Sequence, residues 1–265
     1  MKQMLLCLIA ALLTCGCGRK DDPKKIVVGA TPVPQAEMLE AAKVSLKKRG
    51  YTLEIVEILD YNIPNRALEE NEVDVNFFQH IPFLDEQIKE FGYKIDCYAR
   101  IHLEPMAIYS NKVGSLNSLR MGSIVAIPND PTNEYRALAL LEKQGLIQLR
   151  THQNLQATVE DISSNPKKLR FKEVDSAMLT RVLKDVDAAA IPTNFALQMG
   201  LNPKHDALII ETADSPYANI LAIRIGEEKK PKHQALKEVM ISEEMREFIL
   251  QRYQGAIIPI LKDCN

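Results

Sequence analysis

Three residues that together could form an anion site stand where an apolar run, residues 124–127, passes into a helical sequence. They are Asp130, Pro131 and Arg136. An Asp at the N-cap accepts a free backbone N–H, and Pro at the first helical position has no N–H to leave unpaired. The free N–H groups of such a helix start favour an anion, and an Arg on the next turn can hold a carboxylate through two parallel hydrogen bonds. The stretch therefore predicts a carboxylate site, with an ordinary turn and a solvated or Asp130-paired Arg136 as the alternative.

Strand-like and helical segments alternate along the first part of the chain. We expect strands over 26–30, 52–59 and 73–80, a helix over 35–49, a second helix ending near Asn71 and a third from Pro82. This alternation predicts a mainly parallel sheet with helices on both faces. Ligands of such sheets bind at the carboxyl ends of the strands. The residues expected at those ends are Thr31, Tyr61, Phe78, His80 and the loop 128–132.

A second series of elements begins after the polar, turn-rich segment 111–119. We expect strands over 124–127, 169–174 and 187–191, helices near 132–144, 157–165, 176–183 and from 192, and two tail helices over 232–240 and 242–253. Extended segments over 95–110 and 214–217 connect the two series. We therefore expect two α/β lobes, 26–110 with 215–265 and 111–214. Such a clamshell binds its ligand in the cleft and closes by a hinge motion.

The chain begins with a short apolar run, residues 4–13. About ten apolar residues are too few for a permanent membrane span but are typical of the core of a secretion signal. Small residues that end on a Cys resemble the cleavage site of a bacterial lipoprotein, in which the Cys becomes the lipid-bearing first residue. We choose Cys17, because Gly16 precedes it, over Cys15 or an unlipidated signal. The signal peptide would then cover 1–16 and a charged tether 17–25.

The composition is ordinary for a soluble globular protein, with 46% hydrophobic and 26% charged residues. A net charge of −2 gives no electrostatic reason to expect nucleic-acid binding. No segment after the signal is long and apolar enough to span a membrane. Beyond the signal only Cys97 and Cys264 remain, which excludes a disulfide framework and CxxC-type metal spacing. A single disulfide between these two residues is left open.

Several short segments, in the order in which they occur here, are typical of one protein family. They are 60–65 (DYNIPN), 74–80 (DVNFFQH), 128–133 (PNDPTN) followed by Arg136, and 215–219 (SPYAN). With its lipoprotein-like start, the chain resembles over essentially its whole length the methionine-binding lipoproteins of ABC importers, the NLPA family. The resemblance implies a periplasmic-binding-protein-like (type II) clamshell without catalysis or cofactor. It also implies a lipid-anchored monomer, facing the periplasm or exterior, that delivers an amino acid, foremost L-methionine, to a membrane permease.

The resemblance further implies which residues bind the ligand. It places the ligand's carboxylate on Arg136, helped by Asn133 and the helix start, and it puts Asn219 on the polar groups of the amino acid. It places the ligand's side chain against Tyr61, Phe78 and His80. Aromatic walls suit a thioether through sulfur–ring contacts. The planar fork of an Arg suits a carboxylate better than a Lys does.

Each of these residues has a plainer alternative role. Tyr61 would pack on its own lobe as a turn residue, and His80 would be an ordinary surface or hydrogen-bonded histidine. Phe77 and Phe78 point to opposite faces of a strand, and we expect Phe77 to be the one in the core. Asn219 lies in an expected strand, where an Asn is unfavourable enough to indicate a purpose.

Pro192 is a departure from the family. Its members typically carry, directly after the strand that corresponds to 188–191, an Asn that binds the backbone groups of the ligand. Pro has neither a polar side chain nor an N–H. Asn194 is the candidate to compensate from the first helical turn, with helix capping as an equal alternative. The departure leaves a related amino acid or a short peptide open as the ligand.

Two functions from other classes are weighed against a binding protein. The first is a hydrolytic or transferase enzyme, since two-lobed α/β clefts also host catalysis. The sequence has no G-x-S-x-G elbow, no phosphate loop and no metal-type spacing among its five His. Asp60, Asp74 and Asp130 are acid–base candidates, but they stand in expected turns where Asp is common. The second is a surface lipoprotein that binds a protein through a large exposed apolar patch.

Overall fold

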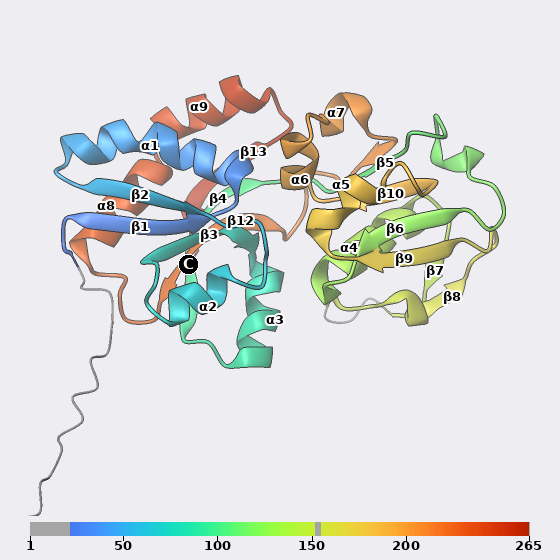
Figure 1. Ribbon diagram of the computed structural model, residues 1–265, viewed down its shortest axis with the longest axis horizontal. Coiled ribbons are helices and arrows are strands. Elements are labelled where there is room, and N and C mark those ends of the chain that lie inside the picture. Colours follow the sequence, from blue (N-terminus) through green and yellow to red (C-terminus); the bar gives the residue numbers. More distant parts are fainter. Residues whose placement is uncertain (1–21, 152–154, 265) are drawn as a thin grey trace, which may run out of the picture.

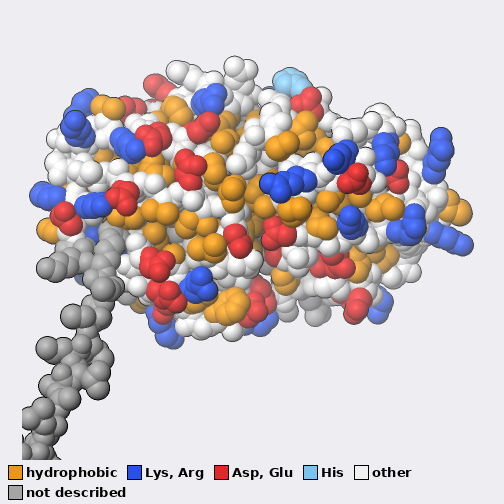
Figure 2. Space-filling view, viewed as in Figure 1, with side chains coloured by type: hydrophobic (Ala, Val, Ile, Leu, Met, Phe, Trp, Pro, Cys, Tyr) orange, Lys and Arg blue, Asp and Glu red, His pale blue; other side chains and the backbone are white. Residues whose placement is uncertain are grey.

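The computed structural model describes residues 22–151 and 155–264, which form two α/β lobes side by side (Figure 1). The expected signal peptide and both candidate lipid-bearing residues, Cys15 and Cys17, lie outside the described residues. Among the residues that are described, none forms a helix long and apolar enough to span a bilayer. On the face seen in Figure 2, acidic and basic side chains are interspersed over both lobes.

The first lobe contains a six-stranded sheet with the strand order β13-β4-β12-β3-β1-β2. The strands are β1 (Lys25–Ala30), β2 (Thr52–Glu57), β3 (Val75–His80), β4 (Ile95–Leu103), β12 (Ala218–Arg224) and β13 (Ile258–Asp263). β1 pairs in parallel with β2 and β3, whereas β12 and β13 pair antiparallel with their neighbours. The prediction of a mainly parallel sheet is therefore wrong for this lobe outside β1–β3, because the two returning strands enter from the opposite direction.

Helices cover both faces of this sheet. One face carries α1 (Glu37–Lys48), α8 (Pro231–Met240) and α9 (Glu243–Tyr253), and the other carries α2 (Pro64–Glu69) and α3 (Ile81–Phe91). Alternate residues of β1 supply both cores, since Ile26 and Val28 pack on the α1 side and Val27 packs on the α2 side. This burial on both faces explains the continuous apolar run of β1.

The second lobe contains a five-stranded sheet with the strand order β11-β5-β10-β6-β9. The strands are β5 (Ala107–Tyr109), β6 (Ile124–Pro128), β9 (Arg170–Val174), β10 (Ala188–Ile191) and β11 (Ile209–Ile210). One face packs on α4 (Pro131–Lys143) and the other on α5 (Leu179–Val182) and α6 (Thr193–Gln198). The short helix α7 (Pro203–Asp206) follows α6.

β5 belongs to the second sheet, where it pairs with β10 and β11. The first crossing between the lobes is therefore Glu104–Pro105–Met106, and the boundary expected after Ser110 lies too late in the chain. Pro105 has no N–H to donate to a ladder, so the first sheet ends ahead of it. The second crossing runs from Glu211 to Tyr217, between β11 and β12.

Two other sequence expectations fail. The helix expected over 157–165 is a single turn, Val159–Asp161, followed by the strand β8 (Ile162–Ser164), which pairs with β7 (Gln148–Leu149). Pro166 disfavours a helix through this region. β13 was not expected, because Pro259 interrupts an otherwise apolar run. β13 is an edge strand, where a missing N–H is tolerated.

A disulfide joins Cys97 on β4 to Cys264 directly after β13, with a Cα–Cα distance of 5.9 Å. The sequence left this pairing open, because it gave no sign that the tail returns to β4 as a strand. The bond ties the end of the described chain to the centre of the first lobe and restricts the unfolded chain.

Candidate functional site

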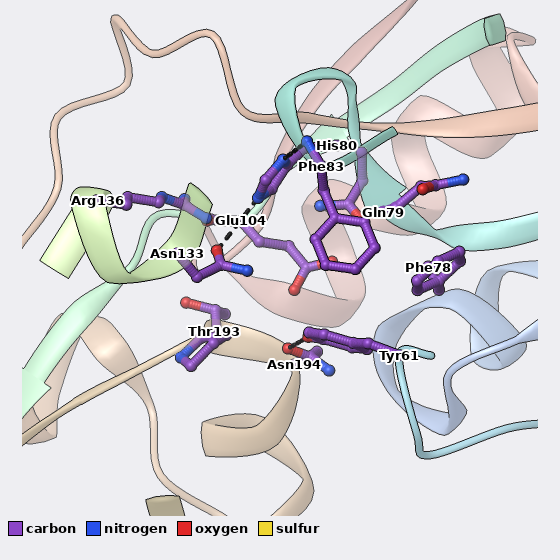
Figure 3. Close-up of a pocket in the computed structure, with 12 residues that line it drawn as sticks. Tyr61, Phe78, Gln79, His80, Phe83, Glu104, Asn133, Arg136, Thr193 and Asn194 are labelled. Atoms are coloured by element: carbon purple, nitrogen blue, oxygen red, sulfur yellow. Dashed lines mark hydrogen bonds between the residues drawn. The ribbon is translucent and has the colours of Figure 1, made fainter. Parts of the chain in front are cut away.

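A cavity lies between the two lobes (Figure 3), with about 350 Å³ of empty space that includes solvent at its opening. It is lined by Tyr61, Phe78, Gln79, His80, Phe83, Glu104, Asn133, Arg136, Pro192, Thr193, Asn194 and Asn219. All seven ligand-binding residues expected from the sequence are therefore brought to one place. Four lining residues were not expected: Gln79, Phe83, Glu104 and Thr193.

One side of the cavity is aromatic. The ring of Tyr61 lies 5.7 Å from that of Phe78 and 5.9 Å from that of Phe83, measured between centroids. Phe78 and Phe83 meet edge to face at 5.7 Å, and Phe195 of the second lobe lies 5.2 Å from Tyr61. Such tilted and edge-to-face pairs are favourable arrangements of aromatic rings. This aromatic side can bury a flexible apolar or sulfur-containing side chain.

Phe78 reaches the cavity because β3 is irregular at that point. In the pairing of β3 with β12, Gln79 faces Ile220 and Phe77 faces Leu221, so Phe78 is an extra, bulged residue. Bulges of this kind re-aim side chains next to binding sites. Phe77 is fully buried in the core of the first lobe, which confirms the expectation for that residue.

A cluster of buried amides braces the same strand. Asn65, at the start of α2, exchanges two hydrogen bonds with Gln79, at 2.8 and 2.6 Å. Asn76 donates to Asn65 Oδ1 at 2.8 Å and to the Pro64 carbonyl at 3.2 Å. These bonds attach β3 to the turn that carries Tyr61, because the motif residues 60–65 and 74–80 interlock.

His80 lies where the aromatic and polar sides meet. Its Nδ1 accepts the backbone N–H of Phe83 at 3.2 Å and so caps α3, while its Nε2–H donates to Asn133 Oδ1 at 3.1 Å. Burial, and next the charge of Arg136, lower the pKa of His80 to about 3. The neutral ring is therefore both a hydrogen-bonded structural residue, as the plainer alternative proposed, and part of the cavity wall.

The helix start at Asp130 is confirmed. The Asp130 side chain accepts the backbone N–H of Asn133 at 3.0 Å, and Pro131 is the first residue of α4. The Asn133 side-chain amide donates to both Asp130 oxygens, at 3.0 and 3.1 Å. Burial raises the pKa of Asp130, and the hydrogen bonds from Asn133 and Thr132 oppose that rise. Asn133 is thereby fixed with its oxygen toward His80 of the other lobe.

Arg136 differs in one respect from the sequence expectation. Its Nε and Nη2 donate to the carboxylate of Glu211 at 3.0 and 2.6 Å, so the edge that would hold a ligand through two parallel bonds is taken. Nη2 also donates to the Glu104 carbonyl at 2.5 Å, and Tyr217 stacks with its centroid 4.5 Å from Cζ. Burial opposes the charge, yet Glu211 outweighs it and raises the pKa of Arg136. The partner is therefore Glu211, not Asp130.

Glu104 places a carboxylate near the centre of the cavity (Figure 3). Its Oε1 accepts from His102 Nε2 at 2.7 Å and from Gln35 Nε2 at 2.6 Å. Gln35 is held in turn by Thr31, whose hydroxyl donates to it at 2.5 Å, and it also donates to Asn219 Oδ1 at 3.1 Å. Thr31 thus supports the site from the layer behind the cavity.

Tyr61 and Asn194 connect the lobes. The Tyr61 hydroxyl donates to Asn194 Oδ1 at 2.8 Å, so the Asn194 oxygen serves the other lobe and not a backbone N–H of α6. Burial, with the carboxylates of Glu104 and Asp130, raises the pKa of Tyr61 well above its ordinary value and keeps it a donor. Pro192 also lines the cavity. With the His80–Asn133 bond, this contact holds the lobes together over the cavity.

The hydrogen bonds among the described residues leave four polar atoms of the cavity without a protein partner. They are Nη1 of Arg136, Oε2 of Glu104, Nδ2 of Asn194 and Nδ2 of Asn219. A cation and an anion of the protein thus both offer a free atom beside an aromatic wall. This is the arrangement that a zwitterion with an apolar side chain requires. In the described part of the chain, no three metal-binding side chains come together.

Glu104 and Glu211 are the residues that sequence reasoning should most have found. Glu104 directly follows β4 at the start of the first crossing, and Glu211 directly follows the apolar strand β11 at the start of the second. A carboxylate that is shielded from water at such a place needs a hydrogen-bonding partner. The partner of Glu211 is Arg136, 75 residues away, and the Glu104 carboxylate accepts from Gln35, 69 residues away, so both contacts lie beyond the reach of local patterns.

Comparison with known proteins shows which family the chain resembles in sequence and fold. The family model described as NlpA lipoprotein matches residues 26–261. The methionine-binding lipoprotein MetQ of Bacillus subtilis is 42% identical over 97% of this chain and 96% of its own length. The D-methionine-binding lipoprotein MetQ of Escherichia coli is 42% identical over 82% of each chain.

Solved structures match equally well. A nutrient-binding protein from Burkholderia cenocepacia, bound to methionine, has a TM-score of 0.86 and 42% identity, covering 89% of this chain and 99% of its own. The methionine-binding protein MetQ has a TM-score of 0.87 and 37% identity, covering 90% and 98%. The type II clamshell fold implied by the sequence is thereby confirmed. Because the family model and these relatives cover nearly the whole folded chain, this protein belongs to the NlpA lipoprotein family.

Proposed function

We propose that this chain is the lipid-anchored substrate-binding protein of an ABC importer, and that it captures L-methionine and delivers it to a membrane permease. One observation carries the proposal: an aromatic wall and an oppositely charged pair, Arg136 and Glu104, face the same cavity between two lobes. The names of the relatives, methionine-binding and D-methionine-binding lipoproteins, support this ligand.

The cavity suggests how the amino acid lies. The carboxylate is held by Arg136 Nη1 beside the start of α4, where the helix dipole also favours an anion. The ammonium lies at Glu104 Oε2, which charge-assisted hydrogen bonding favours. The side chain extends along Tyr61, Phe78 and Phe83, whose edges suit a thioether. Asn194 and Asn219 offer their amide groups to the polar end of the ligand.

The chain then works by binding and not by catalysis. The polar groups of the cavity either form hydrogen bonds with each other or are proposed to bind the charged groups of the ligand. Two hydrogen bonds between the lobes close the cavity. Opening and closing of the lobes controls release, as hinge motions do in two-lobed binding proteins. We place the protein outside the cytoplasm, attached by a lipid on Cys17 and facing the periplasm or exterior, and expect it to act as a monomer.

Pro192 is the reason to test ligands more broadly. It lines the cavity, at the position where the family resemblance implies an Asn that binds the backbone groups of the ligand. A related amino acid or a short peptide is therefore the second candidate. The ring of Pro192 is apolar and therefore favours a ligand without a polar group there.

Calorimetry tests the proposal. The chain from Gly18 onward is stripped of ligand by unfolding and refolding, and is titrated with the twenty L-amino acids, D-methionine and methionine-containing dipeptides. We expect the largest affinity for L-methionine. Tighter binding of a dipeptide or of another amino acid would shift the ligand to the second candidate. No heat with any of them would reject an amino-acid-binding function.

A further inference from the structure

Arg136 is held by both crossings between the lobes. From the first crossing, the Glu104 carbonyl accepts from Nη2 at 2.5 Å. From the second, the Glu211 carboxylate takes the Nε–Nη2 edge at 3.0 and 2.6 Å, and the ring of Tyr217 covers one face of the guanidinium at 4.5 Å. Glu211 also links the crossings, since its Oε2 accepts from Met106 N at 3.1 Å and its own N–H donates to the Met106 carbonyl at 2.8 Å.

These contacts determine which part of Arg136 meets a ligand. Two of its three nitrogens are used, and among the described residues only Nη1 has no protein partner. The guanidinium is planar, so a carboxylate on the Nε–Nη2 edge fixes the direction of Nη1 as well. The side chain of Arg136 is 4% exposed and that of Glu211 is 15% exposed, so the pair is largely but not fully removed from water.

We propose that Glu211 is a positioning residue for ligand binding: it directs Nη1 of Arg136 at the ligand's carboxylate, so that recognition of that carboxylate depends on a residue that does not line the cavity. The inference rests on the proposed function. In the unchanged protein Oε2 accepts from Nη2 and from Met106 N, while Oε1 accepts from Nε at 3.1 Å. A Gln at this position keeps the shape, but if its oxygen takes the place of Oε2, its NH2 group takes the place of Oε1. Two donors, this NH2 group and Nε, then face each other, and the guanidinium turns away from that edge.

The opposite expectation follows if Glu211 acts only through its charge. A carboxylate on Arg136 weakens the attraction of Arg136 for a second carboxylate. Removal of the charge would then strengthen the binding of a ligand carboxylate. If instead Glu211 only stabilises the fold, its loss weakens every ligand to the same degree. A pair of ligands that differ in the carboxylate alone separates these three roles.

L-Methionine and L-methioninol form that pair, because methioninol keeps the ammonium and the thioether but carries a hydroxyl in place of the carboxylate. We define carboxylate selectivity as the ratio of the methioninol Kd to the methionine Kd, measured by calorimetry on the chain from Gly18 onward. We expect Glu211→Gln to lower this selectivity at least tenfold, by weakening methionine binding while methioninol binding changes less than threefold. Asp214→Asn, an exposed residue of the same crossing, is the matched control and leaves the ratio unchanged.

Glu211→Asp is a second variant, which keeps the negative charge but changes the geometry of the contact. It also allows the proposal to be tested if Glu211→Gln does not fold. Asp keeps the charge but is one methylene too short to reach both Arg136 and Met106. We expect it to lower the selectivity as well, at least threefold, with thermal unfolding recorded for every variant. Unchanged selectivity in either folded variant, increased selectivity, or equal weakening of both ligands would overturn the positioning role.

The methionine and methioninol affinities of the unchanged protein distinguish a failure of the proposed function from a failure of the role of Glu211. If it binds methionine and methioninol equally well, or binds neither, the carboxylate assignment in the proposed function fails, and the role of Glu211 fails with it. If it prefers methionine strongly and the Glu211 variants keep that preference, only the role of Glu211 fails.

Discussion

The aromatic side of the cavity and its charged side differ in what holds their residues in place. Tyr61, Phe78 and Phe83 are held by ring contacts between 5.7 and 5.9 Å, with many alternative neighbours. Arg136 is held by directional bonds to Glu211 and Glu104, which come from the two crossings. When one ring contact is lost, the remaining rings still pack on each other and the cost in free energy is small. When one member of a buried charge pair is lost, the other charge remains buried without a partner, and the cost is large.

We therefore expect substitutions on the two sides to reduce ligand affinity by different amounts. The charged side should respond in large steps, because its groups act as a connected network of buried bonds. The aromatic side should respond gradually, because packing contacts are individually small. Both sides meet at His80, which bonds to Asn133 and packs edge-on against Phe83 at 6.2 Å between ring centroids.

Arg136→Met should have the largest effect. It removes the cation of the site, and truncation of one member of a buried charge pair costs about 2–5 kcal/mol of binding. We expect methionine affinity, measured by calorimetry, to fall at least about 30-fold, the lower end of that range. The single change also leaves Glu211 buried without its partner. The double variant Arg136→Met/Glu211→Gln should therefore be more stable than the single one, yet bind as weakly; an affinity within threefold of the unchanged protein would refute the carboxylate role.

Glu104→Gln should have the next largest effect. It keeps the shape of the side chain but removes the anion proposed to face the ammonium, and a hydrogen bond to a charged group contributes about 1.5–3 kcal/mol. Methionine affinity should drop by about 10- to 100-fold. Glu247→Gln, an exposed change on α9, is the matched control. Equal affinities of the two variants would show that the ammonium lies elsewhere.

His80 should make stability depend on pH. The pKa of His80 in the fold is lowered to about 3, so below about pH 6.5 the unfolded chain takes up a proton that the folded chain does not. Stability from this group is complete above about pH 6.5 and decreases as the pH falls, by about 1.4 kcal/mol at pH 5.5. Urea unfolding at pH 7.5 and 5.5 should show this loss in the unchanged protein and a smaller loss in His80→Gln. Identical losses in both proteins would contradict a neutral, buried His80.

Tyr61→Phe should have the smallest effect of the four. It keeps the ring contacts of the aromatic side and removes the hydrogen bond to Asn194, a contact between the lobes. A net hydrogen bond contributes about 0.5–1.5 kcal/mol, so the methionine Kd should rise by about 2- to 10-fold. A loss as large as that of Arg136→Met would mean that this one hydrogen bond between the lobes, and not the ring contacts, dominates the contribution of Tyr61 to ligand binding.

Local features of the site could be predicted from the sequence. The helix start at Asp130 and Pro131 depends on neighbouring residues only, and so does the choice of Phe77 for the core, which follows from strand alternation. The two-lobed organisation also followed from the order of strands and helices. The resemblance to a family indicated, in addition, which strand ends face each other across the cleft.

Long-range partners could not be predicted. The bidentate contact of Glu211 with Arg136 joins residues 75 positions apart, so no local pattern signals it. β13 pairs with β4 across about twice that separation, and Pro259 concealed it as a strand. The first crossing was misplaced because β4 and β5 read as one extended run interrupted by Pro105. These failures concern contacts between distant segments, where packing and not propensity decides.

A crystal structure of the chain from Gly18 onward with L-methionine bound would show directly how the ligand lies. We expect the ligand between the lobes, with its carboxylate within hydrogen-bonding distance of Arg136 Nη1, its ammonium at Glu104 and its sulfur among Tyr61, Phe78 and Phe83. We also expect Glu211 to remain on the Nε–Nη2 edge. A methionine lying in the reverse direction, with its carboxylate away from Arg136, would contradict the proposed roles of Arg136 and Glu104.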